Sequence, residues 1–193
     1  MHGTTVNELK IFVTGVLEEN AYLLYNTARH TAVIIDPGDD ADAVIRFLES
    51  KKLSLQSMLI THGHWDHTGA IPGLQKHSKA PVFIHRDDAG QLKPDGFLEH
   101  GQDHDINGAL YTVIHTPGHS PGGICLYGEG RLFSGDTLFL EGIGRSDLGG
   151  GDGRTLIRMI KERLFTLPDE TVVYPGHGPQ TTIGWEKEHN PFD

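Results

Sequence analysis

The length and composition of the chain are those of one ordinary globular domain. It has 193 residues, of which 37% are hydrophobic and 25 are glycine, so disordered and collagen-like structures are excluded. A chain of this size buries about 70% of its unfolded surface in a single core, and we expect one domain over residues 1–193. The formal net charge of −10 repels a polyanion, which argues against nucleic acid as a partner.

The cysteine content and the start of the chain bear on the compartment. Cys125 is the single cysteine, so no internal disulfide forms, as is usual in a reducing compartment. The first residues lack the basic start and apolar run of a secretory signal, and no stretch approaches the ~18 consecutive apolar residues of a membrane span. We therefore expect a cytoplasmic protein without a membrane partner, and the sequence leaves its oligomeric state open.

The first part of the chain reads as a meander followed by alternating helices and strands. Three segments rich in β-branched or aromatic residues end at turn formers and predict strands: Leu9–Val13, Ala21–Tyr25 and Thr31–Ile35. Apolar residues at helical spacing predict a helix over Asp40–Lys51, and Ser57–Thr61 reads as a buried strand. A second helix over Gly69–His77, with Pro72 in its first turn, precedes a strand at Pro81–His85.

The second part of the chain begins with an irregular segment, Gly90–Asp105, which we expect to form one wall of a substrate crevice. The elements that follow are strands Leu110–His115, Gly123–Tyr127 and Arg131–Ser134, a helix Arg154–Phe165, a strand Thr171–Tyr174 and a short helix near Trp185. Strands outnumber helices, and the helices come between them. The predicted fold class is therefore α/β or α+β.

Four residues of metal-binding types follow a buried strand directly. The chain reads THGHWDH over residues 61–67. Alternation at the strand end sends His62 and His64 to one side, while the turn brings Asp66 and His67 toward a second point nearby. A solvated loop, or a helix N-cap at Asp66, explains one of these residues but not all of them together. The segment therefore predicts a site that can hold two metal ions.

Three later segments each place one ligand-type residue after an apolar strand. His119 follows TPG, Asp136 follows SG and His177 follows YPG. The glycine before each residue allows a tight turn that aims the side chain into a shared crevice. Each residue alone reads as a surface histidine or a turn carboxylate, but the repeated placement favours one common site.

These residues resemble the signature of the metallo-β-lactamase superfamily, and all seven ligand positions are filled: His62, His64, Asp66, His67, His119, Asp136 and His177. The resemblance covers nearly the whole chain and implies a four-layer αβ/βα sandwich with the metals at one edge of two packed sheets. It also implies one metal on His62, His64 and His119, a second on Asp66, His67 and His177, and Asp136 as a bridge. Imidazoles and carboxylates suit Zn²⁺, and also iron or manganese.

Within this superfamily the chain resembles the glyoxalase II branch, the hydroxyacylglutathione hydrolases and their short relatives. The resemblance rests on GDTLF at 135–139, GIGRSD at 142–147 and GGD at 150–152. Glyoxalase II continues into a C-terminal helical domain that helps hold glutathione, and this sequence matches a short form without it. A lysine and an aromatic residue that contact glutathione in the family are replaced by Arg145 and Asp147. Arg145 could clamp a substrate carboxylate bidentately, or pair with Asp147 or Asp152 to brace its loop.

The metal site predicts the chemistry. Two dications that share a water lower its pKa from about 15.7 toward 7 and supply a bridging hydroxide. No Gly-x-Ser-x-Gly elbow is present and Cys125 lies in a predicted strand, so no side-chain nucleophile is required. A thiolate leaves without a general acid, so a thioester suits the site better than a peptide, and Asp66 is the nearest residue to shuttle a proton. Thr61, Thr116 and Asp36 are candidates for hydrogen bonds to the ligand imidazoles.

The leading hypothesis is a binuclear metal-dependent hydrolase of small thioesters that resembles glyoxalase II, which converts S-lactoylglutathione to lactate and glutathione. One alternative is a mononuclear iron persulfide dioxygenase, related by resemblance, with His62, His119 and Asp136 as iron ligands. The other is a non-catalytic metal-binding protein, although structural zinc sites close all four positions, usually with cysteines. β-Lactamase and nuclease activities fit less well with the missing export signal and the negative charge.

Overall fold

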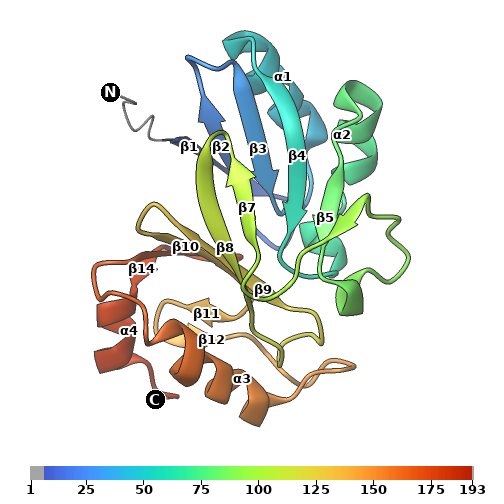
Figure 1. Ribbon diagram of the computed structural model, residues 1–193. Coiled ribbons are helices and arrows are strands. Elements are labelled where there is room, and N and C mark those ends of the chain that lie inside the picture. The colour runs from blue at the N-terminus through green and yellow to red at the C-terminus, as the bar shows by residue number, and fades with distance from the viewer. Residues whose placement is uncertain (1–6, 193) are drawn as a thin grey trace.

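Two six-stranded sheets form the centre of the structure, a computed structural model that describes residues 7–192 (Figure 1). Residues 1–6 and 193, which the single-domain prediction includes, lie outside the described residues. The first sheet has the order β1-β2-β3-β4-β5-β6 and the second the order β14-β13-β10-β9-β8-β7. Consecutive strands are neighbours through most of both sheets, so the two halves of the chain build one sheet each.

The first sheet combines a meander with parallel strands. Its strands are β1 (Glu8–Thr14), β2 (Glu19–Asn26), β3 (Thr31–Ile35), β4 (Ser54–Ile60), β5 (Val82–Ile84) and β6 (Gly96–Phe97). β1 to β3 are antiparallel, as predicted, and β3 to β6 run parallel. The parallel connections carry the helices α1 (Ala41–Lys51) and α2 (Ile71–Ser78), and the short helical turns η1 (Trp65–His67) and η2 (Arg86–Asp88).

The second sheet is mostly antiparallel. Its strands are β7 (Asp103–Ile106), β8 (Ala109–His115), β9 (Ile124–Gly128), β10 (Arg131–Gly135), β13 (Val172–Pro175) and β14 (Thr181–Thr182). The helix α3 (Gly153–Met159) continues as the π-helical turn η3 (Ile160–Leu164) and joins β10 to its parallel neighbour β13. The helix α4 (Ile183–His189) follows β14, and a small hairpin pairs β11 (Leu138–Phe139) with β12 (Gly142–Ile143).

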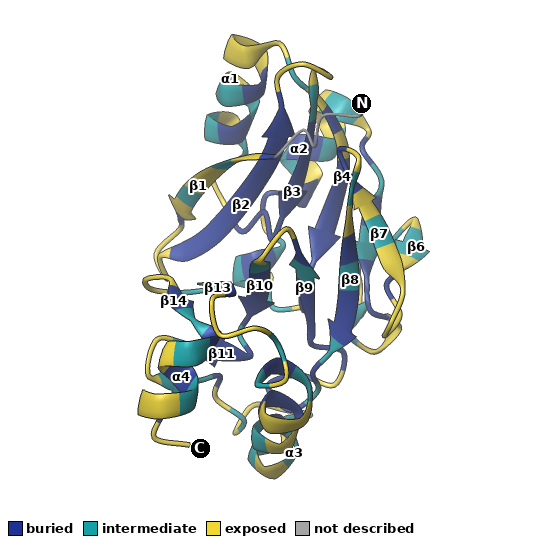
Figure 2. Cartoon of the chain, turned by 60° about the vertical axis from the view of Figure 1, so that its left-hand side comes forward, coloured by how far each residue is buried: buried dark blue, intermediate teal, exposed yellow. Residues whose placement is uncertain are grey.

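Strand alternation divides the apolar residues into three layers. Leu23 of β2 packs with the helices α1 and α2, whereas its neighbour Leu24 faces the second sheet. A third apolar cluster lies between the second sheet and the helices α3 and α4 and includes Leu132 and Leu156. Figure 2 shows the buried strands between helices whose outer faces are exposed. These three apolar layers between four layers of structure confirm the predicted αβ/βα sandwich.

The segment Gly90–Asp105 is only partly irregular, so that prediction was wrong in part. It contains β6 and the first residues of β7, which pairs antiparallel with β8. β7 has the sequence DHDI, and three of its four residues are polar because it is the edge strand of its sheet. Such a strand lacks the apolar run by which buried strands are recognised.

The strand ends bring distant segments of the chain to one edge of the sandwich. The segment that follows β4, the loop between β8 and β9, and the ends of β10 and β13 carry the predicted ligands. The backbone of Asn20, at the start of β2, donates a hydrogen bond of 2.8 Å to Gly176 next to His177. Within residues 7–192, no helix is long and apolar enough to cross a membrane.

Phe133 lies between the sheets and tests this packing. It is fully buried, and its ring lies 5.3 Å from that of Tyr174 and 5.1 Å from that of Tyr22. Phe133→Ala is expected to lower the free energy of unfolding by about 3–5 kcal/mol, measured by urea denaturation, because the sheets cannot close fully around the lost ring. Leu110→Ala, at an exposed leucine, is the control and should change it by no more than about 0.5 kcal/mol. Equal effects of the two substitutions would contradict the packing.

Candidate metal centre

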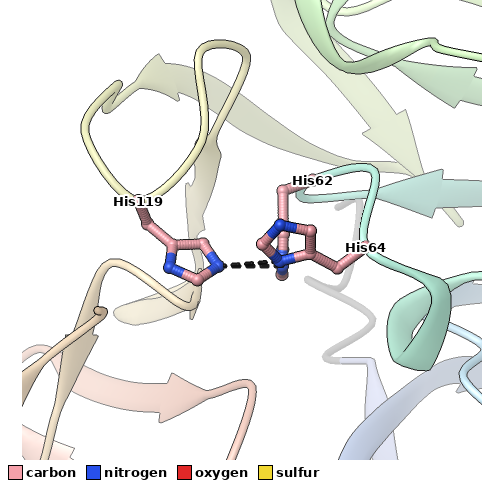
Figure 3. A group of neighbouring side chains, drawn as sticks. All are labelled: His62, His64 and His119. Atoms are coloured by element: carbon pink, nitrogen blue, oxygen red, sulfur yellow. Dashed lines mark hydrogen bonds between the residues drawn. The ribbon is translucent and has the colours of Figure 1, made fainter. Parts of the chain in front are cut away.

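Three imidazoles converge on one point at the edge of the sandwich. His62 and His64 come from the segment after β4, and His119 comes from the loop between β8 and β9 (Figure 3). His62 Nε2 lies 3.0 Å from His64 Nδ1 and 3.3 Å from His119 Nε2, and His64 Nδ1 lies 3.0 Å from His119 Nε2. These spacings are close to the edge of a tetrahedron around zinc, about 3.3–3.4 Å for Zn–N bonds of about 2.0–2.1 Å. The group can hold one metal ion.

A second group lies beside the first. Asp66 Oδ2 is 3.2 Å from His177 Nε2 and 3.7 Å from His67 Nε2. Asp66 and His67 belong to η1, while His177 follows β13, so the two strands β4 and β13 deliver the ligands from opposite sheets. These three side chains can also hold a metal ion. These two groups of neighbouring side chains correspond to the two sets that the family resemblance implies, and their role as metal ligands stays a prediction.

Asp136 stands between the two groups. Its Oδ1 lies 3.4 Å from His67 Nε2 in the second group, and its Oδ2 lies 3.5 Å from His119 Nε2 in the first. Asp136 follows β10 directly, where Gly135 adopts a positive φ of 48° and an added Cβ would lie 2.3 Å from the Thr61 hydroxyl. Only glycine allows this turn, which places the carboxylate in a bridging position.

The protonation of the site fits cation binding. Burial lowers the pKa of His62 well below its ordinary value and also lowers that of His64, so both are neutral, as metal binding requires. Burial opposes a proton on His67 too, but the Asp36 and Asp136 carboxylates outweigh it and raise its pKa well above the ordinary value. Burial raises the pKa of Asp136, but the hydrogen bond and charge of His67, with smaller contributions from other histidines of the site, lower it below its ordinary value. The proton on His67, held between the Asp36 and Asp136 carboxylates, supplies the positive charge that a dication would supply.

Two buried atoms of the site support this interpretation. His67 Nε2 and Asp136 Oδ1 are buried and have no hydrogen-bond partner among the described residues. A buried polar atom without a partner costs about 1–3 kcal/mol, so such atoms are uncommon. His67 Nε2 and Asp136 Oδ1 lie 3.4 Å apart, and a metal cation in place of the proton on His67 would satisfy both atoms. The donor set therefore fits the metal ions that the sequence predicts.

The outer nitrogens of the imidazoles are held by the surrounding chain. His67 Nδ1 is 3.1 Å from Asp36 Oδ2, and this carboxylate also accepts hydrogen bonds from the backbone and hydroxyl of Thr61. His119 Nδ1 lies 2.7 Å from the carbonyl oxygen of Arg145, and His177 Nδ1 lies 3.0 Å from that of Leu17. Each contact fixes the ring so that its other nitrogen faces the metal position.

The expected orienting residues are confirmed in two cases of three. Asp36 binds the ring of His67, and Thr61 lies 3.2 Å from His62 Nδ1. The expectation for Thr116 is wrong: its hydroxyl is buried against Thr137 Oγ1 at 2.8 Å and Cys125 Sγ at 3.4 Å, and it contacts no ligand ring. Its place before the TPGH turn in the sequence did not reveal that the side chain faces the interior.

An open recess of about 800 Å³ lies over the site. His64, Asp66, His119, Asp136 and His177 are at its floor, and the other lining residues are Leu17, Trp65, Phe139, Arg145, Leu148 and Gly149. The segment Gly90–Asp105 contributes none of these residues, so the expectation that it forms a wall of the crevice was wrong. It runs along the far side of β5 instead, where β6 pairs with that strand.

Arg145 lines the recess, and its guanidinium is paired with a neighbour. Its Nε and Nη2 donate to the two carboxylate oxygens of Asp147 at 2.7 and 2.8 Å. Asp152, the other candidate for this pairing, instead caps α3 through the backbone N–H groups of Arg154 and Thr155. The loop-bracing interpretation is therefore what the structure shows, and a role for Arg145 in binding a substrate carboxylate stays a prediction.

Comparison with known families agrees with the site. The family model of the metallo-beta-lactamase superfamily matches residues 14–177. The chain belongs to this superfamily. Among relatives, it is 34% identical to the hydroxyacylglutathione hydrolase GloC of Haemophilus influenzae, over 95% of this chain and 97% of that protein. It is also 34% identical to the probable metallo-hydrolase YqgX of Bacillus subtilis, over 92% and 93% of the two chains.

Several solved structures share the fold over nearly the full length of this chain. The BLEG-1 B3 metallo-β-lactamase is 40% identical with a TM-score of 0.89, over 96% of this chain and 99% of that one. ETHE1 from Myxococcus xanthus is 32% identical with a TM-score of 0.89, over 95% and 83% of the chains. TTHA1623, solved in a di-iron-bound form, is 35% identical with a TM-score of 0.86, over 95% and 100%.

Asp88 ties the two loops that carry the first ligand group, and sequence reasoning missed it. Its Oδ2 accepts a hydrogen bond of 3.1 Å from Gly63 N, between His62 and His64, and its Oδ1 accepts one of 2.6 Å from Gly122 N in the His119 loop. A Cβ on either glycine would lie within 2.6 Å of the Asp88 backbone. In the sequence Asp88 is an ordinary acidic residue after a strand, so no local signal marks it.

Removal of single ligands tests the two-group arrangement of this metallo-β-lactamase fold. His177→Ala removes a ligand of the second group only, so the purified protein should hold about one metal equivalent in place of two, measured by plasma mass spectrometry. Asp136→Ala, between the groups, should lower the content at both. His189→Ala is the control, because His189 is exposed and its ring stacks on Trp185 away from the recess. Unchanged metal content in His177→Ala would contradict the assignment.

A second pair of variants tests Asp88. Asp88→Ala is expected to lower the free energy of unfolding by about 1–3 kcal/mol and metal affinity by about 10- to 100-fold, because both ligand loops lose their shared acceptor. Asp95→Ala is the matched control, since Asp95 Oδ2 accepts a single backbone hydrogen bond of 2.9 Å from Val82, at the other end of β5. It should lower stability by a similar amount and leave metal affinity unchanged, as measured by competition with a chromophoric chelator. Equal metal affinities in the two variants would show that Asp88 is merely structural.

Proposed function

We propose that the chain is a metal-dependent hydrolase of small thioesters with two divalent metal ions as cofactors. The observation that carries the proposal is the pair of ligand groups joined by Asp136 at the floor of an open recess. Two dications in adjacent sites supply a nucleophile at neutral pH, because they lower the pKa of a shared water from about 15.7 toward 7. Likeness to the hydroxyacylglutathione hydrolase GloC supports a thioester as the substrate.

The residues that would hold the ions are those of the two groups. His62, His64 and His119 would bind one ion, Asp66, His67 and His177 the second, and Asp136 both. Nitrogen and oxygen ligands without a thiolate suit Zn²⁺, and they also suit iron or manganese. The di-iron form of TTHA1623 supports iron as the alternative to zinc.

The side chains around the recess offer no competing nucleophile. None of the described residues that line it is a serine, threonine or cysteine. Cys125 is fully buried in β9, and burial raises the pKa of its thiol to about 11, so the thiol is neither ionised nor accessible. The proposal therefore assigns the nucleophile to a water activated at the metal ions.

Asp66 has two roles in this proposal. Burial opposes its charge, but the hydrogen bond from His177 and the positive charge of His67 together outweigh burial and lower the pKa of its carboxyl, so it is ionised and able to bind a metal ion. It also lines the recess, where it is the carboxylate best placed to accept or deliver a proton. Because a thiolate leaves unprotonated, a thioester makes little demand on this proton step, whereas a departing amine would require it.

Metal content and turnover in one sample test the proposal. Protein purified without added metal should contain about two equivalents of zinc, or of zinc mixed with iron or manganese, and should hydrolyse S-lactoylglutathione. Loss of the thioester absorbance measures the reaction. A chelator should abolish hydrolysis, and added zinc should restore it, since the ligands remain in place.

The runner-up function, an iron persulfide dioxygenase, gives the opposite outcome. Its support is the overall likeness to ETHE1 from Myxococcus xanthus. About one equivalent of iron, no thioester hydrolysis, and oxygen consumption with glutathione persulfide would replace the hydrolase with the dioxygenase. Metal binding without either activity would favour a non-catalytic metal-binding protein.

A further inference from the structure

The walls of the recess differ at its two ends. At the His177 end, Leu17 offers its carbonyl oxygen to the His177 ring, and the ring of Phe139 lies 6.4 Å from the same ring. Trp65, at the start of η1 between the ligands His64 and Asp66, also lines the recess. At the His119 end, the recess is bounded by the loop of Arg145 and Leu148. An apolar wall therefore stands beside one ligand group and a mixed wall beside the other.

Two large apolar residues that line the recess are exposed. Trp65 is 65% exposed and Leu17 is 50% exposed, although both border a site made of charged and polar groups. Exposed apolar surface at the mouth of a polar pocket is surface that a ligand covers. A ligand group that covers it must itself be apolar, because a charged group would lose its hydration there without a partner.

The recess has little positive charge to offer a substrate apart from its metal ions. Arg145 is the one lysine or arginine among the described residues that line it, and Asp147 already pairs with the Nε–Nη2 edge of its guanidinium. Glutathione carries two carboxylates at neutral pH. Neither would meet an unpaired side-chain cation among these lining residues. Charge recognition is therefore weak, and apolar contact is the stronger source of selectivity.

We propose that the His177 end of the recess is a pocket for an apolar substituent, so that the preferred substrates are thioesters of aliphatic or aromatic acyl groups. Trp65 and Leu17 determine this preference. The inference rests on the proposed thioester hydrolysis and adds the substrate class to it. The inference assigns two roles within the recess. The metal-ligand groups act on the thioester carbonyl, and the apolar wall selects the acyl substituent attached to that carbonyl.

A series of acyl thioesters of one neutral thiol, N-acetylcysteamine, tests the proposal on the metal-loaded protein. The acyl groups are acetyl, butyryl, hexanoyl and phenylacetyl. kcat/KM should rise along the aliphatic series by up to about fourfold per methylene, the gain expected for a fully buried methylene group. Hexanoylglutathione should react no better than the neutral hexanoyl thioester, because the recess offers the peptide carboxylates no partner.

Variants of the wall give the second arm of the experiment. Trp65→Ala and Leu17→Ser should flatten the dependence of kcat/KM on acyl chain length. Trp185→Ala and Leu110→Ser are the matched controls, because they replace the other tryptophan and another exposed leucine, neither of which lines the recess. Both controls should keep the wild-type dependence.

A binding measurement that does not depend on turnover completes the test. In a Trp185→Phe background Trp65 is the single tryptophan. Its fluorescence should change saturably with S-hexyl-N-acetylcysteamine, a thioether that cannot be hydrolysed, and Leu17→Ser should weaken this binding. Fluorescence that does not respond to the thioether would show that Trp65 does not contact the substituent, and would overturn its role.

The outcomes separate the two proposals. If the rate of thioester hydrolysis does not depend on acyl chain length, the hydrolase stands and the apolar pocket is wrong. The same holds if the glutathione thioester is preferred over the neutral thioester by about tenfold or more, which is the effect of one charge-assisted hydrogen bond. If no thioester of the series or S-lactoylglutathione is hydrolysed, the proposed function fails, and the inference that rests on it fails too.

Discussion

The close approach of three imidazole nitrogens, from His62, His64 and His119, is the constraint on which the rest of the site depends. They lie 3.0–3.3 Å apart in a buried corner where a proton can satisfy only one pair at a time. A dication satisfies all three lone pairs, but only if the chain holds the rings at this spacing before the ion binds. The fold meets this requirement by placing the ligands in short segments that follow β4, β8, β10 and β13, where the sheets fix the start of each segment.

Contacts behind the ligands maintain the spacing. Asp36 and the carbonyl oxygens of Arg145 and Leu17 each hold the outer nitrogen of one ring, so the ring cannot turn away from the metal position. Asp88 adds a connection between the two loops of the first group. The same contacts join the metal site to the recess, because Leu17 and Arg145 present their carbonyl oxygens to ligand rings and also line the recess.

The ligands were predictable from the sequence because they are local features. The segment THGHWDH, and single residues after apolar strands, carry their signal within a few positions of the chain. Asp88 and Leu17 carry none, since Asp88 lies 25 residues from Gly63 and Leu17 lies 160 residues from His177. β7 was missed for a related reason. Its residues are mostly polar, and they form a strand because they pair with β8, which the polar pattern of β7 itself does not indicate. The sequence left two partners open for Arg145, and only the folded loop selects Asp147.

The ligand scaffold and the recess wall therefore carry different information about function. Structures as differently named as a B3 metallo-β-lactamase and ETHE1 share this fold at a TM-score of 0.89, so the fold and its metal site do not by themselves specify a substrate. The wall residues lie on connections outside the large sheets: Leu17 between β1 and β2, Trp65 on η1, and Arg145 and Leu148 after β12. Such segments can change without disturbing the strand ends that fix the ligands. In the function proposed for this chain, selectivity therefore belongs to residues that border the metal site without binding the metal.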